Sequence, residues 1–463
     1  MQPPSPTLPL RLDLGDLGSV VCSTALRVLP GRRWTLSGST GHGARAVVVK
    51  LFLPGRRARR DFLRERRGLE TLHQRGISAP PLLYAGAAAE LDGWAVVTAA
   101  LDGHTADALG EAALPAVVRA VALLHAEHIV QRDVHLGNFL IANGVAWALD
   151  GAGVRAHTGL SAGRARRDLA RWLAQYPPSI DRRSGELLTL YRTARWDRGR
   201  IGSADGFRQQ IARERRRRER RQVAKALRTC TAFVASRTLR RFSVIDRHAD
   251  APELRDWLAA PDAPFDDPQA HWLKRGRSAS VVHVQLDGRE LVVKRYNLKN
   301  FAHRLRRFWR PSRAWHSWRA AQRLLLWGVR TPRPVALLEK RFGPLRGRAF
   351  YVTEYAPGPS LTTALPAADL PTRALLLRNL CALLNTLARV RLSHGDLKAT
   401  NLLVDQEHNL MLLDLDALRR HRRRAAYFRA LDRDVQRLRA NWTDQPALLE
   451  ELDRALTQAG LLK

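Results

Sequence analysis

The sequence predicts an α+β protein that consists of two copies of one domain in tandem. The chain has 463 residues, which is enough for two or three domains. Short apolar runs typical of strands alternate with segments of helical periodicity in both halves. An ordered set of motifs in the first half also recurs in the second half. The content of 45% hydrophobic and 26% charged residues argues against a fibrous or disordered chain.

The charge of the chain favours an anionic partner. Lysine and arginine total 78 against 43 acidic residues, a net charge of +35, which suits nucleic acid, a membrane face or a phosphorylated substrate. Cys22, Cys230 and Cys381 lie far apart without metal-binding spacing, which argues against a disulfide scaffold or structural zinc and favours a reducing cytosol. Residues 1–14 lack the apolar region of a secretion signal, and no 18 apolar residues run without charge. We therefore expect neither a secretion signal nor a membrane span.

The repeated motifs begin with a strand that ends in lysine, at Lys50 in the first half and at Lys294 in the second. Lysine occurs only 8 times against 70 arginines, so lysine at both strand ends is a selected feature. A compact ammonium reaches between phosphates, which a forked guanidinium does not replace. The next pairs are Gly76–Pro80 with Gly328–Pro332, and Val97–Gly103 with Val352–Gly358.

The strongest pair of motifs places an aspartate five residues before an asparagine. Asp133 precedes Asn138 in the first copy, and Asp396 precedes Asn401 in the second. An apolar strand then leads to a further aspartate in each copy. These later residues are Asp150, 17 residues beyond Asp133, and Asp414, 18 residues beyond Asp396.

The domain boundaries follow from the motif positions. A last pair of motifs, Arg167–Arg171 and Arg433–Arg437, lies on segments of helical periodicity. Between the copies, seven of the nine residues in Arg213–Arg221 are arginine, which predicts a basic amphipathic helix with a solvated face. The predicted divisions are an N-terminal tail at 1–17, a first domain at 18–195, a basic helical linker at 196–264 and a second domain at 265–463.

The spacing of these aspartates and asparagines suits phosphoryl transfer. That reaction needs metal ions and a cation that bind the phosphates, and a carboxylate that orients and deprotonates the acceptor hydroxyl. In the second copy, Asp396 would accept the acceptor's proton, while Asn401 and Asp414 would bind magnesium through oxygen. Lys294 would reach the phosphates of ATP. The corresponding set in the first copy is Asp133, Asn138, Asp150 and Lys50.

This ordered set resembles the protein-kinase-like superfamily. His394–Asn401, with Leu413–Asp416 after it, is similar to the catalytic loop and metal-binding segment of that superfamily. More narrowly, Trp318, Gly328–Pro334 and Tyr351–Tyr355 resemble the bacterial lipopolysaccharide core kinases, which phosphorylate Kdo or heptose sugars. The resemblance implies two tandem bilobal domains. Each would have a small antiparallel sheet lobe with one helix and a larger, mostly helical lobe, with ATP between them.

The resemblance also implies roles for further residues. Lys398 would stabilise the transferring phosphoryl group, and His135 occupies the same place in the first copy. A glycine cluster precedes each strand lysine and would close over the phosphates through backbone N–H groups. The cluster is Gly38, Gly41 and Gly43 in the first copy and includes Gly276 and Ser278 in the second. Glu354 and Tyr355 are the remaining residues expected to contact the nucleotide.

Each copy departs once from the kinase pattern, so the sequence leaves open which copy is active. Kinases pair the strand lysine with a helix glutamate, and the residue eleven before the loop glycine is Glu65 in the first copy but Ser317 in the second. The second copy therefore lacks that partner unless Glu339 or another acid substitutes. In the first copy, Gln131 stands where His394 stands in the second.

The expected function is an ATP- and magnesium-dependent kinase of a sugar hydroxyl in the lipopolysaccharide core. The substrates would be anionic, phosphorylated glycolipid precursors. We therefore expect the basic protein to be cytoplasmic and peripheral to the inner membrane. The segment between Phe301 and Trp315 mixes arginines with aromatics, which suits a membrane interface, single-stranded nucleic acid or simple packing under a helix. We do not expect nucleic acid as the partner. The alternatives are a serine/threonine protein kinase or small-molecule kinase, and a pseudokinase pair that binds anionic lipid or nucleic acid.

Overall fold

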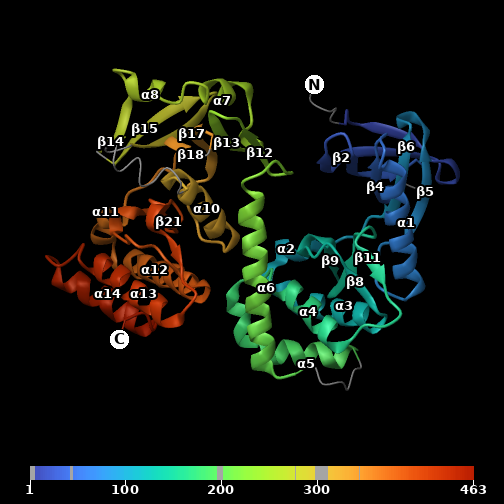
Figure 1. Ribbon diagram of the computed structural model, residues 1–463. Helices are drawn as coiled ribbons and strands as arrows, with labels where there is room; N and C mark the ends of the chain where they lie inside the picture. Colours follow the sequence, from blue (N-terminus) through green and yellow to red (C-terminus); the bar gives the residue numbers. More distant parts are fainter. Residues whose placement is uncertain are drawn as a thin grey trace. The chain divides into compact units, whose positions relative to one another are not determined.

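The computed structural model describes residues 6–41, 45–195, 202–276, 278–297, 311–343 and 345–462. These residues form two compact units, 1–218 and 219–463, and each unit combines a sheet with a mostly helical part (Figure 1). The mixed helix and sheet content agrees with the predicted α+β class. The boundary between the units falls within helix α6 (Ala204–Lys225) rather than at the predicted domain ends.

The first unit contains a six-stranded antiparallel sheet in the order β1-β2-β3-β4-β6-β5. Val47, Val49 and Leu51 alternate with Val48 and Lys50 along β4, so the three apolar residues enter one core and Lys50 faces away from it. The strands are β1 (Leu10–Asp13), β2 (Ser19–Leu29), β3 (Arg33–Thr40), β4 (Ala46–Phe52), β5 (Leu82–Ala88) and β6 (Gly93–Ala99).

Part of the predicted tail at 1–17 belongs to this sheet. Residues Leu10–Asp13 pair with β2, and Leu12 and Leu14 are fully buried. The apolar alternation at Leu10, Leu12 and Leu14 is the physical reason, because one face of the short strand is covered. The predicted tail at 1–17 therefore differs from the structure over its described part.

The other part of the first unit is mostly helical. Its core surrounds α3, whose residues between Leu114 and Leu124 are largely buried. The stretch Ala106–Ala126 is long and apolar enough to cross a membrane, but 56% of its most apolar window is buried within the protein, as in the core helix of a globular fold. The elements are α1 (Ala58–Gln74), β7 (His104–Thr105), α2 (Ala106–Leu109), α3 (Leu114–Ala126), β8 (Ile129–Gln131), β9 (Phe139–Ala142), β10 (Val145–Ala148), β11 (Val154–Ala156), α4 (Ala162–Leu173) and α5 (Ser184–Arg195).

The second unit contains a seven-stranded antiparallel sheet in the order β12-β13-β17-β18-β16-β15-β14. Two of its strands lie in the predicted linker at 196–264. Along β13, Phe242 and Val244 enter one core while Ile245 enters the other, so this segment is an inner strand rather than a connection. The strands are β12 (Phe233–Arg237), β13 (Arg241–Asp246), β14 (His271–Lys274), β15 (Ala279–Leu286), β16 (Arg289–Tyr296), β17 (Pro334–Phe342) and β18 (Leu345–Glu354).

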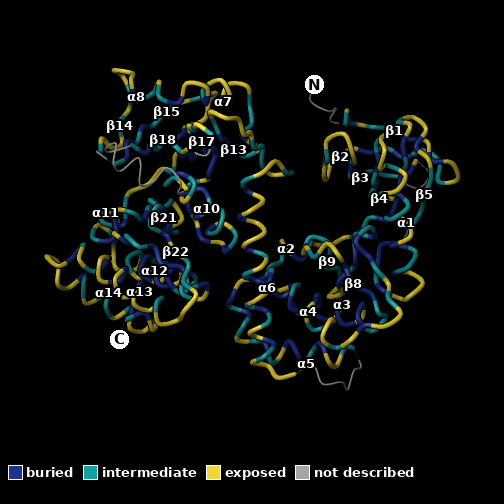
Figure 2. The backbone as a smooth tube through the Cα atoms, viewed as in Figure 1, coloured by how far each residue is buried: buried dark blue, intermediate teal, exposed yellow. Residues whose placement is uncertain are grey.

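Helices cover the rest of the second unit, and Figure 2 shows the buried residues gathered where they pack. Trp318 and Trp442 are fully buried in this core. The elements are α7 (Pro252–Trp257), α8 (Ala263–Asp266), α10 (Arg313–Leu326), α11 (Leu361–Ala367), α12 (Leu370–Val390), β19 (Leu392–Ser393), β20 (Leu402–Val404), β21 (Leu410–Leu412), β22 (Arg419–Arg420), α13 (Arg424–Arg439) and α14 (Pro446–Gln458).

Five strands lie in the same order in the two sheets, β2-β3-β4-β6-β5 in the first and β14-β15-β16-β18-β17 in the second. The third strand carries the lysine in each case, Lys50 or Lys294, and α1 or α10 follows it. Both helices end at a glycine with left-handed backbone, Gly76 at φ 64° and Gly328 at φ 69°. The motifs that repeat in the sequence therefore occupy corresponding places in the two units.

Helix α6 carries the arginine-rich segment. Within the first unit, Arg215 is buried and binds Asp181 through both terminal nitrogens, at 2.7 and 2.8 Å. Within the second unit, Glu219 is almost fully buried and accepts from Arg323 and from the indole of Trp327. Arg213 and Arg217 are exposed, as a solvated face predicts.

Candidate active sites

The aspartate–asparagine motif forms the same hydrogen-bonded loop in both units. In the second unit, the side-chain amide of Asn401 donates to the backbone oxygen of Asp396 at 2.9 Å. In the first unit, Asn138 donates to the backbone oxygen of Asp133, also at 2.9 Å. The amide nitrogen of each asparagine is thereby used, which leaves its side-chain oxygen available to a metal ion.

The strands that follow each loop place the later aspartate, Asp150 or Asp414, next to the loop asparagine. The backbone N–H of Leu149 donates to Asn138 at 2.9 Å, and that of Leu413 donates to Asn401 at 2.8 Å. Asp150 and Asp414 follow these leucines directly. The fold therefore brings Asp133, Asn138 and Asp150 together in the first unit. It brings the corresponding Asp396, Asn401 and Asp414 together in the second unit.

The residue two before each aspartate makes an equivalent contact in the two units. His394 hydrogen-bonds through Nε2 to the backbone oxygen of Leu413 at 2.8 Å. Gln131 donates to the backbone oxygen of Asp150, a longer contact at 3.4 Å. Gln131 therefore retains a weaker form of the link that joins the loop to the following segment.

A buried helix aspartate anchors the loop of the second unit. Asp434 of α13 accepts from the backbone N–H of His394 at 2.7 Å and from that of Gly395 at 2.9 Å. Asp168, at the same motif position in the first unit, instead pairs with His125 and Arg171. The sequence analysis predicted no specific role for Asp168 or Asp434. The signal that could have shown it was the Arg-Asp pair repeated in Arg167–Arg171 and Arg433–Arg437.

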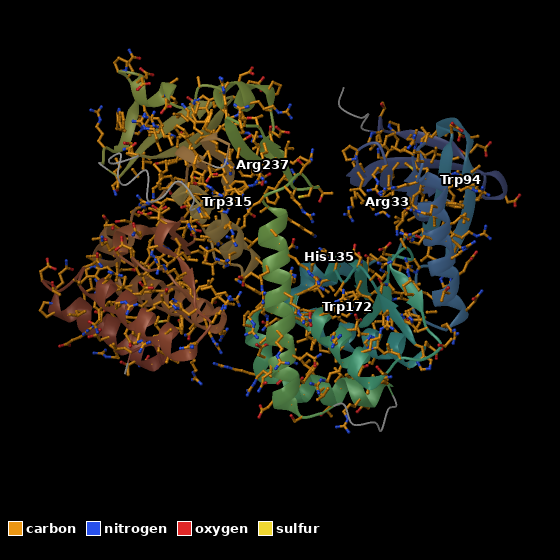
Figure 3. All side chains as sticks on the ribbon, viewed as in Figure 1. Arg33, Trp94, His135, Trp172, Arg237 and Trp315 are labelled. Carbon is orange, nitrogen blue, oxygen red and sulfur yellow. The ribbon has the colours of Figure 1, made fainter. Side chains whose placement is uncertain are left out.

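In the first unit the loop rests on an aromatic pair. Phe139 follows Asn138 and packs on Trp172 of α4, with ring centroids 4.8 Å apart. Figure 3 labels Trp172 in the first unit. Both rings are almost fully buried. Burial on this scale fixes the backbone from which Asn138 projects.

In the first unit, Lys50 forms the ion pair that the helix glutamate predicts. The Lys50 ammonium donates to Glu65 of α1 at 2.5 Å and to the backbone oxygen of Leu149 at 2.7 Å. Burial raises the pKa of Glu65, but the Lys50 charge and hydrogen bonds offset it and hold that pKa below its ordinary value. The backbone N–H groups of Gly151 and Ala152 also donate to Glu65, each at 3.1 Å.

In the second unit a different carboxylate takes the place of the helix glutamate. Lys294 binds Asp414 at 2.6 Å and Asp416 at 3.2 Å. Ser317, which occupies the helix position, donates to Asp416 at 2.6 Å. Tyr296 also donates to Asp416, at 2.5 Å. The substitute acid left open by the sequence is therefore Asp416, two residues beyond the expected metal ligand.

Glu339 is not that substitute. It is fully buried and is occupied by Arg341 at 2.6 Å, by Arg346 at 3.2 Å and by the hydroxyl of Ser312. Ser312 caps the start of α10 through the N–H of Trp315. Glu339 thus positions the beginning of α10 rather than Lys294.

Charge and backbone geometry distinguish the two aspartates expected to hold metal. Burial and the neighbouring Glu65 raise the pKa of Asp150 to about 6, and its Oδ1 is buried without a hydrogen-bond partner among the described residues. Asp414 has left-handed backbone at φ 50°, a strained conformation for an aspartate. A buried carboxylate oxygen, which is 4.0 Å from the Lys50 ammonium, and a nearby asparagine oxygen are the donor types that magnesium prefers. The residues present therefore fit a hard divalent cation.

The first unit holds a large cavity at this site, of about 1060 Å³. Lys50, Asp133, Asn138 and Asp150 all line it. Residues 98–101, at the end of β6 and directly after it, form another part of the cavity wall. A volume of this size suits a nucleotide together with part of a second molecule.

Neither described glycine of the predicted cluster, Gly38 or Gly41, lines this cavity. Gly31, in the turn between β2 and β3, lines the cavity. Gly38 lies within β3 opposite Val47, and Gly41 donates to Ser19, while Gly43 falls outside the described residues. Counting about 18 residues back from each lysine, as from Lys294 to Gly276, would have found Gly31.

The nucleotide contacts predicted in the second unit lie in separate places. Ser278 accepts through its backbone oxygen from Arg313 at 3.4 Å, and Arg313 in turn binds Asp416 at 2.5 Å. Gly276 and the pair Glu354 and Tyr355 line two different cavities, and neither cavity includes Lys294 or Asp414. Lys398 is 3.3 Å from Asp396 and exposed.

The segment predicted to mix arginines and aromatics is described only from residue 311 onward. Arg304, Arg306, Arg307, Arg310, Phe301, Phe308 and Trp309 lie outside the described residues. Trp315 packs against Phe242 with ring centroids 5.0 Å apart, and Arg346 lies over its ring. The described part therefore agrees with packing under a helix.

The comparisons with known proteins bear on the second unit. Residues 255–459 match the model of the lipopolysaccharide kinase (Kdo/WaaP) family. This match places the chain among the kinases. The matched range contains the Lys294, Asp396, Asn401 and Asp414 set and most of the second unit. No curated protein matches the chain.

Among solved structures, the chain is similar to two kinase domains. The PknI kinase domain of Mycobacterium tuberculosis, solved as a cysteine-to-alanine mutant, is 14% identical, with 46% of this chain and 99% of that chain covered and a TM-score of 0.30. The BubR1 kinase domain is 12% identical, with 46% of this chain and 83% of that chain covered and a TM-score of 0.32.

Proposed function

We propose that the chain is an ATP- and magnesium-dependent phosphotransferase that acts on a sugar hydroxyl of the lipopolysaccharide core, a Kdo or a heptose. The observation that carries the proposal is the family match over residues 255–459, which contains a complete set of phosphoryl-transfer residues. Asp396, in the loop held by Asp434, orients the acceptor hydroxyl and receives its proton.

The other residues of the second unit act on ATP. Lys294, held by Asp414 and Asp416, binds the phosphates. Asn401 and Asp414 supply the oxygen ligands for magnesium, which neutralises charge on the phosphates when it is bound. Lys398, beside Asp396, places a second cation where the transferring group passes.

We propose that the first unit is a second protein-kinase-like domain, in tandem with the other. The shared strand order and the matching loop hydrogen bonds support this reading. The buried Lys50–Glu65 pair and the cavity beside Asp133 favour a unit that binds nucleotide.

A basic chain that acts on anionic glycolipid precursors would work in the cytoplasm at the inner face of the membrane. The net charge of +35 supports this location, because the cytoplasmic leaflet carries anionic lipids. The alternatives remain outcomes of the test: a protein or a small soluble molecule as acceptor, or binding of anionic lipid or nucleic acid without turnover.

The test measures transfer of the γ-phosphate of ATP to intact and deacylated lipopolysaccharide core, with and without magnesium, and to a mixture of proteins in parallel. The full chain is compared with Asp396→Ala, Asp133→Ala, the double variant and Asp444→Ala, an exposed control. The proposal expects magnesium-dependent transfer to core and not to proteins, with the phosphorylation of at least one core hydroxyl lost in Asp396→Ala and kept in Asp444→Ala. Transfer only to proteins, or nucleotide binding without any transfer, would replace it with one of the alternatives.

A further inference from the structure

Two cations lie beside the carboxylate of Asp396 in the second unit. Its Oδ1 is 3.3 Å from the ammonium of Lys398 and 4.0 Å from Nε of Arg437. Among the described residues, no group hydrogen-bonds to Oδ2 of Asp396. These contacts leave Oδ2 as the carboxylate oxygen that can accept the proton of an acceptor hydroxyl.

Arg437 also holds the backbone that leads into Asp396. Its Nη1 donates to the backbone oxygen of Gly395 at 2.6 Å. Asp434, one turn earlier on α13, accepts from the backbone N–H of Gly395 at 2.9 Å. Both backbone polar groups of Gly395 are therefore fixed by one helix. Because the oxygen of Gly395 belongs to the same planar peptide group as the N–H of Asp396, the contact with Arg437 sets the orientation of that peptide.

The first unit has an arginine at the same place, with different partners. Arg171 of α4 donates to the backbone oxygen of Arg132, the residue before Asp133, at 3.3 Å. Its other terminal nitrogen donates to Asp168 at 2.8 Å. Among the described residues, no ion pair joins Arg171 to Asp133. The link between the helix arginine and the loop backbone thus occurs in both units, whereas the described residues show the link to the loop carboxylate in the second unit alone.

The chemistry of the two cations divides their work. Lys398 is 53% exposed and carries a flexible ammonium, which suits a group that turns toward the transferring phosphoryl group. Arg437 contacts a backbone oxygen and a carboxylate through separate N–H groups of one planar guanidinium. Its Nη1 is 3.9 Å from the carboxylate of Asp434, which two backbone N–H groups of the loop already occupy. Arg437 therefore remains beside Asp396 while Lys398 binds phosphate.

We propose that Arg437 is a positioning residue for Asp396, an inference that rests on the proposed function. It fixes the peptide before Asp396 and holds Oδ1 by its charge, so that Oδ2 takes up the acceptor's proton. In the transfer step the acceptor oxygen bonds to the γ-phosphorus, the bond between that phosphorus and the bridging oxygen of ADP breaks, and the proton passes to Oδ2. A displacement of the base by about 1 Å is enough to slow such a step by about a hundredfold.

The test compares kcat and KM in the full chain that carries Asp133→Ala, so that transfer comes from the second unit. The readouts are magnesium-dependent phosphorylation of deacylated lipopolysaccharide core, the KM for ATP and the melting temperature. Arg433→Gln is the matched control. Arg433 is exposed on the same helix, one turn before Arg437, and its side chain has no ion pair or hydrogen bond with the described residues.

We expect Arg437→Gln to lower kcat by about 10- to 100-fold, with the KM for ATP within about twofold of the parent chain, because Lys294 and the metal ligands are untouched. Arg433→Gln should keep the parent kcat. Arg437→Lys should recover part of the loss, because it restores the charge beside Oδ1 but one ammonium does not reproduce both contacts. Parent kcat in Arg437→Gln would overturn the proposal, and so would a loss that Arg437→Lys does not relieve and that follows a fall in melting temperature.

Hydrolysis of ATP without core separates this proposal from the proposed function, because Asp396 also orients water as the acceptor. If the parent chain hydrolyses ATP but phosphorylates no core sugar, the proposed function fails. Slower hydrolysis in Arg437→Gln, but not in Arg433→Gln, would then still support the role of Arg437. Equal hydrolysis in the two variants would overturn that role. If instead Arg437→Gln phosphorylates core at the parent rate, the proposed function stands and the positioning role fails.

Discussion

Replacing Asp416 by asparagine is the sharpest perturbation of the second unit. The substitution keeps the shape but removes the charge that faces Lys294, Arg313 and the hydroxyls of Ser317 and Tyr296. The Asp416 side chain is only 10% exposed, and breaking a buried ion pair costs about 3 to 5 kcal/mol. Lys294 would then pair with Asp414 alone, which draws Asp414 away from magnesium.

The assay is the initial rate of phosphate transfer at several magnesium and ATP concentrations. We expect Asp416→Asn to lower turnover or magnesium affinity by about 10- to 100-fold, the usual effect of removing a group that orients a metal ligand. Glu339→Gln is the matched control, because Glu339 is more deeply buried and is also ion-paired, but it contacts Arg341 and Ser312 instead of Lys294. It should lower the unfolding temperature without changing the dependence on magnesium. An Asp416→Asn enzyme with wild-type rates and magnesium dependence would refute the role given to Asp416.

Three further predictions concern the loops and their supports. In a Lys294→Ala background, which removes the lysine assigned to bind ATP in the second unit, Glu65→Gln should weaken nucleotide binding by the first unit, because Lys50 loses its buried partner; an unchanged affinity for fluorescent ATP would show that the pair is idle. Asp434→Asn should reduce transfer by the second unit more than it lowers melting temperature, since it loosens the backbone before Asp396; proportional losses would mean a purely structural role. Trp172→Ala should cost about 3 to 5 kcal/mol in the free energy of unfolding of the first unit, measured in urea, and a loss below about 1 kcal/mol would contradict its place under the catalytic loop.

Local spacing was enough to predict the loops. The Asp-to-Asn interval of five residues fixes a tight turn closed by its own hydrogen bonds, so Asn138 and Asn401 fall where the sequence predicted. The same holds for Glu65, because a count from the helix-ending Gly76 places it on the face of α1 that meets Lys50.

The contacts made across the fold were not accessible from spacing. Asp416 reaches Lys294, 122 residues away in the sequence, only because the segment after Asp414 packs against α10. The strand β13 was assigned to a linker because the neighbouring arginine run dominated that segment, although the short, mostly apolar run Phe242–Ile245 between charged residues was the available signal. Gly31 was missed because no second glycine accompanies it.

The central claim is that Asp396 drives transfer to a core sugar. The most direct measurement is a single-turnover rate of transfer from ATP to deacylated lipopolysaccharide core, with Asp396→Asn compared against Asp133→Asn at saturating magnesium. The account predicts that Asp396→Asn abolishes the phosphorylation of at least one core hydroxyl that Asp133→Asn still phosphorylates, with nucleotide affinity retained. A normal rate and an unchanged product in Asp396→Asn would contradict it.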